Sequence, residues 1–181
     1  LGLLSHSGSR GLGANIAKHY TYLASKQCPL PKQVQHLAWL DMDTHDGQEY
    51  WLAMNLAGDY AKACHDDIHY RISKALGKRP VATIENHHNF AWKQEVNGKE
   101  CIVHRKGATP AAKGELGIIP GSMTAPGYIV RGTGNEASLA SASHGAGRLH
   151  SRRKCKEQFT GSQLKQHLKN HDVTLIGGGI D

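Results

Sequence analysis

The stretch VATIENHHNFAWKQEVNGKECIVHR, residues 81–105, decides the fold class. It opens on Val81–Ile84, which is rich in β-branched residues and predicts a strand. Further along, Asn97-Gly98 is the pair that two-residue hairpin turns favour, because both turn positions need a positive φ. We therefore expect an antiparallel hairpin whose strands lie at 92–96 and 100–104.

Upstream of this stretch, a helical pattern runs from Asp46 to about Leu76. Apolar side chains recur at spacings of three and four residues, and Gly77 supplies a stop. One long helix and a broken pair of helices both fit the pattern. The segment from Ala24 to Leu37 holds two prolines and many polar residues, which predicts a surface loop. The repeating apolar positions of the helical pattern are Trp51, Met54, Ala57, Ala61, Cys64, Ile68 and Ile72.

Downstream of the hairpin, the pattern predicts short strands followed by a helix. The strands are expected at Leu116–Ile119, Tyr128–Val130 and Val173–Ile176, and the helix at about Ser162–Asn170. Because strands and helices do not alternate regularly, as they do above a parallel sheet, we predict an α+β fold.

Composition narrows the class of protein. A hydrophobic fraction of 39% and a charged fraction of 20% suit a soluble globular protein. No apolar run approaches the roughly 18 residues that cross a bilayer, so no membrane partner is expected. The net charge of +7 favours an anionic partner, nucleic acid first, although a generally basic surface explains it equally well. Four cysteines without a CxxC pair fit free thiols, and we expect a cytoplasmic protein.

Five polar, glycine-rich stretches stand out from the rest of the chain. They combine histidines with small residues that expose backbone N–H groups, and with hydroxyls or cations. Taken singly, a histidine beside glycines is more often a turn residue than a catalytic one. The stretches are His6–Gly11 (HSGSRG), Asn86–Asn89 (NHHN), His104–Thr109 (HRKGAT), Pro120–Met123 (PGSM) and Ser143–Arg148 (SHGAGR).

Taken together, the five stretches predict phosphoryl or nucleotidyl transfer. Imidazoles from separate segments can converge on a transition metal, and Ser hydroxyls, Arg forks and backbone N–H groups bind phosphate. His144, framed by small residues, suits a nucleophile or a general acid/base. The cations that we expect to bind phosphate are Arg10, Arg105, Lys106, Arg148 and Arg152.

The same stretches, in this order, resemble the RtcB family of RNA ligases from His6 to Asp181. The resemblance implies mixed β-sheets around a central active-site cleft flanked by helices, with residues 1–181 forming one catalytic core segment. It also implies an enzyme that uses GTP and Mn²⁺. Such an enzyme joins an RNA 3′-phosphate, or a 2′,3′-cyclic phosphate after hydrolysis, to a 5′-hydroxyl end.

The resemblance also implies roles for single residues. His144 would carry GMP as a phosphoramidate, and His6 and His88 would bind metal. Arg10 and Arg148 match positions that contact phosphate or RNA, with Arg105, Lys106 and Arg152 as looser matches; His87 and His104 are as well explained by structural roles. The positions that would contact the guanine nucleotide are His88, Asn89, Pro120, Gly121, Ser122, Met123, His144, Gly145, Ala146 and Gly147.

The sequence departs from the family pattern in ways that leave alternatives open. The acidic–cysteine and Gly-Asn-His motifs that complete the family's metal site do not occur in it, and the nucleotide-binding lysine would follow Asp181. We therefore expect a segment truncated at both ends. An RNA-binding or inactive remnant without ligase chemistry is the main alternative; an unrelated phosphoesterase would favour aspartates over histidines as ligands. The physiological RNA and the oligomeric state are left open.

Overall fold

The computed structural model describes residues 2–6, 11–145 and 150–177. The chain divides into two compact units, Leu1–Ala82 (unit 1) and Thr83–Asp181 (unit 2). None of the helices in the described ranges is long and apolar enough to cross a membrane.

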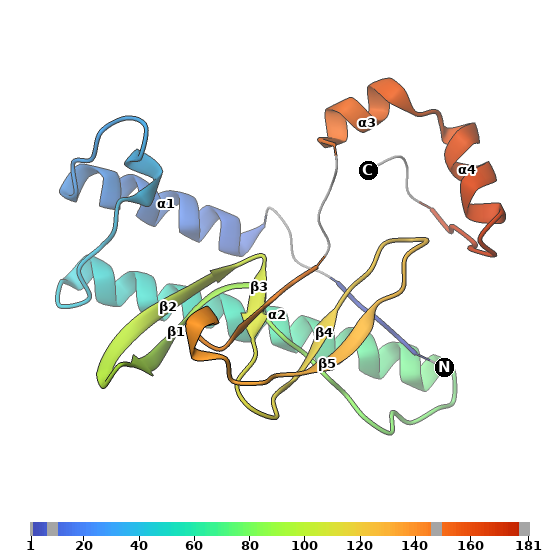
Figure 1. The fold of residues 1–181 in the computed structure, drawn as a ribbon, viewed down its shortest axis with the longest axis horizontal. Helices are drawn as coiled ribbons and strands as arrows, with labels where there is room; N and C mark the ends of the chain where they lie inside the picture. The colour runs from blue at the N-terminus through green and yellow to red at the C-terminus, as the bar shows by residue number, and fades with distance from the viewer. Residues whose placement is uncertain (1, 7–10, 146–149, 178–181) are drawn as a thin grey trace. The chain divides into compact units, whose positions relative to one another are not determined.

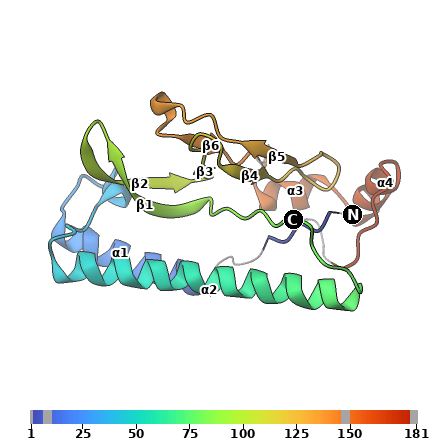
Figure 2. The same cartoon turned by 90° about the horizontal axis from the view of Figure 1, so that it is seen from below.

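Unit 1 is a pair of helices that lie side by side (Figures 1 and 2). Their interface buries Tyr20 and Ala24, and the Tyr20 ring lies 4.9 Å from the ring of Tyr50. Because burial of aromatic and apolar surface is favourable, this contact contributes to the stability of unit 1. The helices of unit 1 are α1 (Leu12–Gln27), the 3₁₀ turn η1 (Gln35–Leu37) and α2 (His45–Ala75).

The structure decides between one long helix and a broken pair in favour of a single α2. The surface loop predicted at 24–37 is wrong in part, because α1 continues to Gln27 and buries Ala24. Its polar last residues misled the prediction, since they lie on the exposed side of a helix. The helix ends just before Pro29, whose missing N–H and rigid ring would interrupt it.

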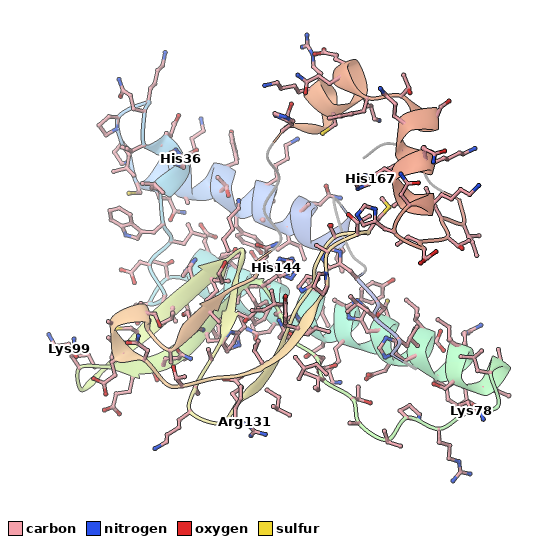
Figure 3. The ribbon with its side chains drawn as sticks, turned by 45° about the vertical axis from the view of Figure 1, so that its right-hand side comes forward. His36, Lys78, Lys99, Arg131, His144 and His167 are labelled. Atoms are coloured by element: carbon pink, nitrogen blue, oxygen red, sulfur yellow. The ribbon has the colours of Figure 1, made fainter. Side chains whose placement is uncertain are left out.

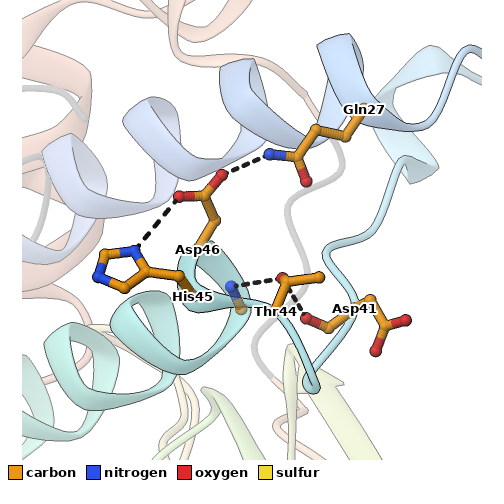
Figure 4. Close-up of polar contacts among 6 residues, drawn as sticks. Gln27, Asp41, Thr44, His45 and Asp46 are labelled. Carbon is orange, nitrogen blue, oxygen red and sulfur yellow. Dashed lines mark hydrogen bonds and ion pairs between the residues drawn. The ribbon is translucent and has the colours of Figure 1, made fainter.

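The start of α2 is fixed by a side-chain cap (Figure 4). The Thr44 hydroxyl oxygen accepts from the N–H of Gly47 at 3.2 Å, and the hydroxyl donates to the carbonyl of Asp41 at 2.6 Å. Gly47 is required here, because a Cβ would lie 2.0 Å from that carbonyl oxygen. Asp46, in the first turn, complements the helix dipole and accepts from Gln27, so the end of α1 is tied to the start of α2.

The described residues of unit 2 form three antiparallel pairs of strands (Figure 2). The predicted hairpin is confirmed: Asn89 pairs with Lys106 at one end and Val96 with Lys99 at the other. Asn97 and Gly98 have φ values of 52° and 74°, as the turn requires. The pairs are β1 (Asn89–Val96) with β2 (Lys99–Lys106), β3 (Ala108–Pro110) with β6 (Ser141–Ser143), and β4 (Leu116–Ile119) with β5 (Tyr128–Arg131).

Short helices complete unit 2. The helix predicted at 162–170 is confirmed, and Thr160 and Gln163 form a capping box at its start. The helices are the 3₁₀ turn η2 (Glu136–Ser138), α3 (Arg152–Gln158) and α4 (Gly161–Lys169).

Two predicted strands are wrong. Residues 173–176 are irregular, because the N–H of Val173 bonds back to the carbonyl of Leu168 at the end of α4. Residues 81–84 are also irregular, and the side chain of Val81 is fully exposed. In both segments β-branched residues suggested a strand, yet among the described residues no neighbouring strand supplies hydrogen bonds.

The α+β class is confirmed by this mixture of helices and small sheets. Among the described strands all pairs are antiparallel, where mixed sheets were predicted; tight turns and short connections such as Asn97-Gly98 favour antiparallel neighbours. The central cleft and the single catalytic segment over 1–181 stay predictions.

Candidate functional site

Gly107 joins three of the predicted site residues in unit 2. Its N–H donates to the carbonyl of His88 at 2.7 Å and to the side-chain oxygen of Asn89 at 3.1 Å. Its carbonyl accepts from the N–H of His144 at 2.9 Å. The φ of Gly107 is +66°, a conformation that glycine adopts at little cost. One glycine after β2 therefore ties the segment that enters β1 to the segment that leaves β6.

The imidazoles of His88 and His144 contact each other as a result. Their ring centroids are 4.1 Å apart with a tilt of 33°, and ligand nitrogens of the two rings lie within 4.8 Å of each other. Both side chains are half-buried, and His144 directly follows β6 (Figure 3). Two imidazoles at this spacing can bind one metal ion, or one can act as a nucleophile while the other binds metal.

Gly145 brings the chain after His144 against the end of β4. It has a φ of +81°, and a Cβ on it would lie 2.4 Å from Cγ2 of Ile119. The hydroxyl oxygen of Ser143 accepts from the N–H of Gly145 at 3.2 Å. Since Pro120 follows Ile119, the PGSM turn and the SHG segment are neighbours in space.

The PGSM turn is held largely by its own backbone. The N–H of Ser122 donates to the carbonyl of Ala125 at 3.2 Å, and the Ser122 hydroxyl oxygen accepts from the N–H of Ala125 at 3.1 Å. A Cβ on Gly121 would lie 2.1 Å from the carbonyl oxygen of Ala125, so the turn closes only with glycine there. Ser122 and Met123 are exposed beside this turn, and their contact with a nucleotide stays a prediction.

Asn86 supports the site and was not predicted as a site residue. Its amide oxygen accepts from the N–H of Ile118 at 2.9 Å, and its amide nitrogen donates to the same residue's carbonyl at 3.3 Å. The segment before β1 is thereby fastened to β4. The signal in the sequence was an asparagine directly before two histidines, since an Asn side chain can both donate to and accept from backbone groups.

The paired histidines of the NHHN stretch differ in their surroundings. His87 stacks on Phe90, with ring centroids 5.2 Å apart and a tilt of 26°, whereas His88 contacts His144. This contact favours the structural explanation of His87. His104, on β2, is exposed.

Arg105 is placed differently from the prediction that it contacts phosphate. It is only 3% exposed, and its guanidinium donates to Gln94, to the Ser141 hydroxyl and to the carbonyl of Leu139. Burial lowers the pKa of Arg105, and the charge of Glu115 opposes that change. The prediction for Arg105 is therefore corrected: the side chain is engaged inside unit 2.

The next residue, Lys106, is exposed, because successive side chains of a strand point to opposite faces. A phosphate contact by Lys106 is thus compatible with its position and stays a prediction.

The remaining predicted site residues lie outside what the structure describes of unit 2. Arg10, Ala146, Gly147 and Arg148 lie outside the described residues. Arg152 begins α3, but its side chain also lies outside them. His6 belongs to unit 1 and is exposed, and its sharing of a metal with His88 stays a prediction.

A family model described as tRNA-splicing ligase RtcB matches residues 1–177. The chain belongs to the RtcB family. This confirms the resemblance carried by the five polar stretches, and it places the His88–His144 contact within an RtcB-family chain.

Curated RtcB proteins are similar over most of the chain. The RNA-splicing ligase RtcB of Escherichia coli K12 is 37% identical over 174 residues, covering 87% of this chain and 42% of that protein. The tRNA-splicing ligase RtcB of Thermococcus kodakarensis is 31% identical, covering 98% and 43%. That of Pyrococcus abyssi is 29% identical, covering 94% and 22%. The chain thus spans less than half the length of these relatives.

Proposed function

We propose that the protein is an RNA ligase that joins an RNA 3′-phosphate, or a 2′,3′-cyclic phosphate after its hydrolysis, to a 5′-hydroxyl end. GMP carried on His144 activates the 3′-phosphate. Membership of the RtcB family and the names of the relatives support this proposal. The observation that carries it is the contact of the His144 imidazole with the imidazole of His88.

The proposed reaction has three steps, and atoms balance in each. First, a neutral imidazole nitrogen of His144 attacks the α-phosphorus of GTP; a P–N bond forms and pyrophosphate leaves. Next, an oxygen of the RNA 3′-phosphate attacks that phosphorus, and His144 is released as RNA receives GMP. Finally, the 5′-hydroxyl attacks the RNA 3′-phosphate, a phosphodiester forms, and GMP leaves with the proton lost to solvent.

The chain's own residues position the first step. The hydrogen bond from the His144 N–H to the carbonyl of Gly107 fixes the backbone position of His144, and contact with His88 limits rotation of its imidazole. A nucleophile held in place before the substrate binds loses less entropy in the transition state, which is a large part of catalysis in phosphoryl transfer.

His88 would hold Mn²⁺ together with His6. The residue of unit 2 fits Mn²⁺ by its chemistry, because imidazole is a normal ligand for first-row divalent metals. The His88 imidazole also lies beside the proposed nucleophile. When bound, the metal would supply charge neutralisation for the phosphates of GTP.

The remaining contacts belong to the same proposal. Asn89, the Pro120–Met123 turn and Gly145–Gly147 would bind the guanine nucleotide, and Arg10 and Arg148 would bind RNA phosphates together with Lys106 and Arg152. The positions of Asn89 and Gly145 support the nucleotide contacts. The side chain of Asn89 is hydrogen-bonded to Gly107, and Gly145 lies against Ile119, next to Pro120. The location that we propose is the cytoplasm, where cysteines stay free as they are in this chain.

The decisive experiment incubates the protein, at its natural length, with labelled GTP and Mn²⁺. We expect covalent GMP that is lost in acid and survives alkali, as a phosphoramidate is. His144→Gln abolishes the label, whereas His36→Gln, at an exposed position in η1, keeps it.

Three outcomes would contradict the proposal in different ways. Label on the His144→Gln protein would identify another nucleophile. Normal ligation by an unlabelled wild-type protein would remove the covalent step. RNA binding without either label or ligation would favour a binding module over an enzyme.

A further inference from the structure

A bend in an unfavourable conformation precedes β6. Leu139 and Ala140 have φ values of 52° and 47°, and neither is glycine. Side chains rarely adopt this left-handed region, so two successive residues there must be held by their surroundings. The bend is the last structure before the three-residue strand β6, and His144 follows that strand.

Arg105, on β2, helps to hold this bend, together with backbone bonds such as that from the N–H of Ala140 to the carbonyl of Asn135 at 2.9 Å. Its Nη2 donates to the carbonyl of Leu139 at 2.9 Å and lies 3.5 Å from that of Ala140. Its Nε donates to the Ser141 hydroxyl at 2.8 Å, and that hydroxyl in turn donates to the Leu139 carbonyl at 3.1 Å. The guanidinium therefore binds the carbonyl of Leu139 in the bend and the side chain of Ser141, the first residue of β6.

The surroundings of Arg105 indicate that its role is more than filling space. The guanidinium lies over the ring of Trp92, 4.8 Å from the centroid, and also donates to Gln94. Its Nη1 is buried without a hydrogen-bond partner among the described residues, a cost that an apolar side chain would avoid. Only the planar fork of arginine offers donors in the directions that these oxygens occupy.

The bend is connected to His144 through a very short path. Strand β6 pairs with β3 over Ser141–Ser143, and the His144 N–H then bonds to Gly107. A strand of three residues has few hydrogen bonds to its partner, so a displacement of the bend is passed on along β6.

We propose that Arg105 is a positioning residue that fixes the Leu139–Ala140 bend and, through β6, sets where the His144 imidazole lies. The inference rests on the proposed function, in which His144 is the nucleophile. It assigns Arg105 a part in the first step without contact with GTP, RNA or metal.

The test compares Arg105→Gln with a triple variant that also carries glycine at both positions of the bend. Glycine adopts the left-handed region freely, so Leu139→Gly with Ala140→Gly should keep the bend without Arg105. We measure the rate of GMP uptake by the natural-length protein, its unfolding midpoint, and the His144 imidazole C–H resonance, assigned from its loss in His144→Gln. Arg131→Gln is the matched control, because the exposed Arg131 also donates to a backbone carbonyl, that of Gly114.

We expect Arg105→Gln to shift the His144 resonance and to slow GMP uptake at least about tenfold, as small misplacements of reacting groups do. The two glycines restore most of the rate and return the resonance, although they cannot replace the contact with Trp92. Arg131→Gln changes neither. Arg105→Lys, which retains the charge and loses the fork, falls between wild type and Arg105→Gln.

The proposal is overturned if the His144 resonance stays in place in Arg105→Gln, or if the glycines restore neither readout in a folded protein. If Arg105→Gln fails to fold, Ser141→Ala replaces it, because it removes the hydroxyl that accepts from Arg105. We expect the same shift of the His144 resonance and the same slower GMP uptake. A wild-type protein that takes up no GMP contradicts the proposed function alone, because the resonance still reports whether Arg105 positions His144.

Discussion

Gly145 combines two constraints in one residue. Its φ of +81° lies in the region that favours glycine, and an added Cβ would approach Cγ2 of Ile119 to 2.4 Å. We predict that Gly145→Ala lowers the stability of the protein by about 1–3 kcal/mol, because strain and overpacking add. GMP uptake should fall as well, because the chain beside His144 must move.

The measurement is thermal unfolding alongside labelled GTP. Gly161→Ala is the control. Gly161 is the first residue of α4, and a Cβ there would meet no atom within 4 Å, so the stability of this variant should be unchanged or slightly raised. Equal midpoints for Gly145→Ala and wild type would mean that the chain relaxes around the methyl group.

At single residues, the structure brings together the predicted His88 and His144, whereas it buries the predicted cation Arg105. Arg105 and Lys106 are adjacent and both basic, yet one is buried and the other exposed. Charge alone suggested that both meet phosphate. Which of them points inward depends on the register of β2 and on the acceptors that β6 offers, and neither can be deduced from the local sequence.

The N-terminal cap of α2 is the clearest case of an element fixed by one side chain. Thr44→Ala removes the acceptor for the N–H of Gly47, and we predict a loss of about 1 kcal/mol in the free energy of unfolding. Denaturant titration measures it. Thr44→Ser retains the hydroxyl and should cost clearly less, so an equal loss in both variants would assign the effect to the lost methyl group.

Elements with strong periodicity were predicted, and elements defined by a partner were missed. The long helix α2 and the β1–β2 hairpin carry their signals within themselves. Strands β3 and β6 have three residues each, too few for a pattern, and exist because they pair with each other. The irregular segments at 81–84 and 173–176 have strand-like composition but no such partner.

For the whole molecule, the net charge of +7 is compatible with the RNA ligand that we propose. We predict that RNA affinity falls steeply with salt, and that Arg148→Gln reduces the slope of log affinity against log salt by about 0.7, the value for one phosphate contact with a single strand. Arg148→Lys keeps most of that slope but ligates more slowly, because the bidentate fork is lost. Ligation by Arg148→Lys at the parental rate would remove Arg148 from the proposed contacts.

Family membership was predictable from the order of five short stretches, and the contact of His88 with His144 was not. Nothing in either stretch specifies the other, since the contact depends on Gly107 bonding to both segments.

The β1–β2 hairpin adjoins the candidate site at one end. Its Asn89–Lys106 pair adjoins Gly107, whereas the Asn97-Gly98 turn lies at the far end of the ladder. Residues inserted at that turn would lengthen the ribbon outward and leave both histidines in place. One residue inserted beside Gly107 would reverse the faces of the chain that follows. Within the lineage of this protein, length can therefore vary at the tip of the ribbon, while its base must keep an unchanged number of residues.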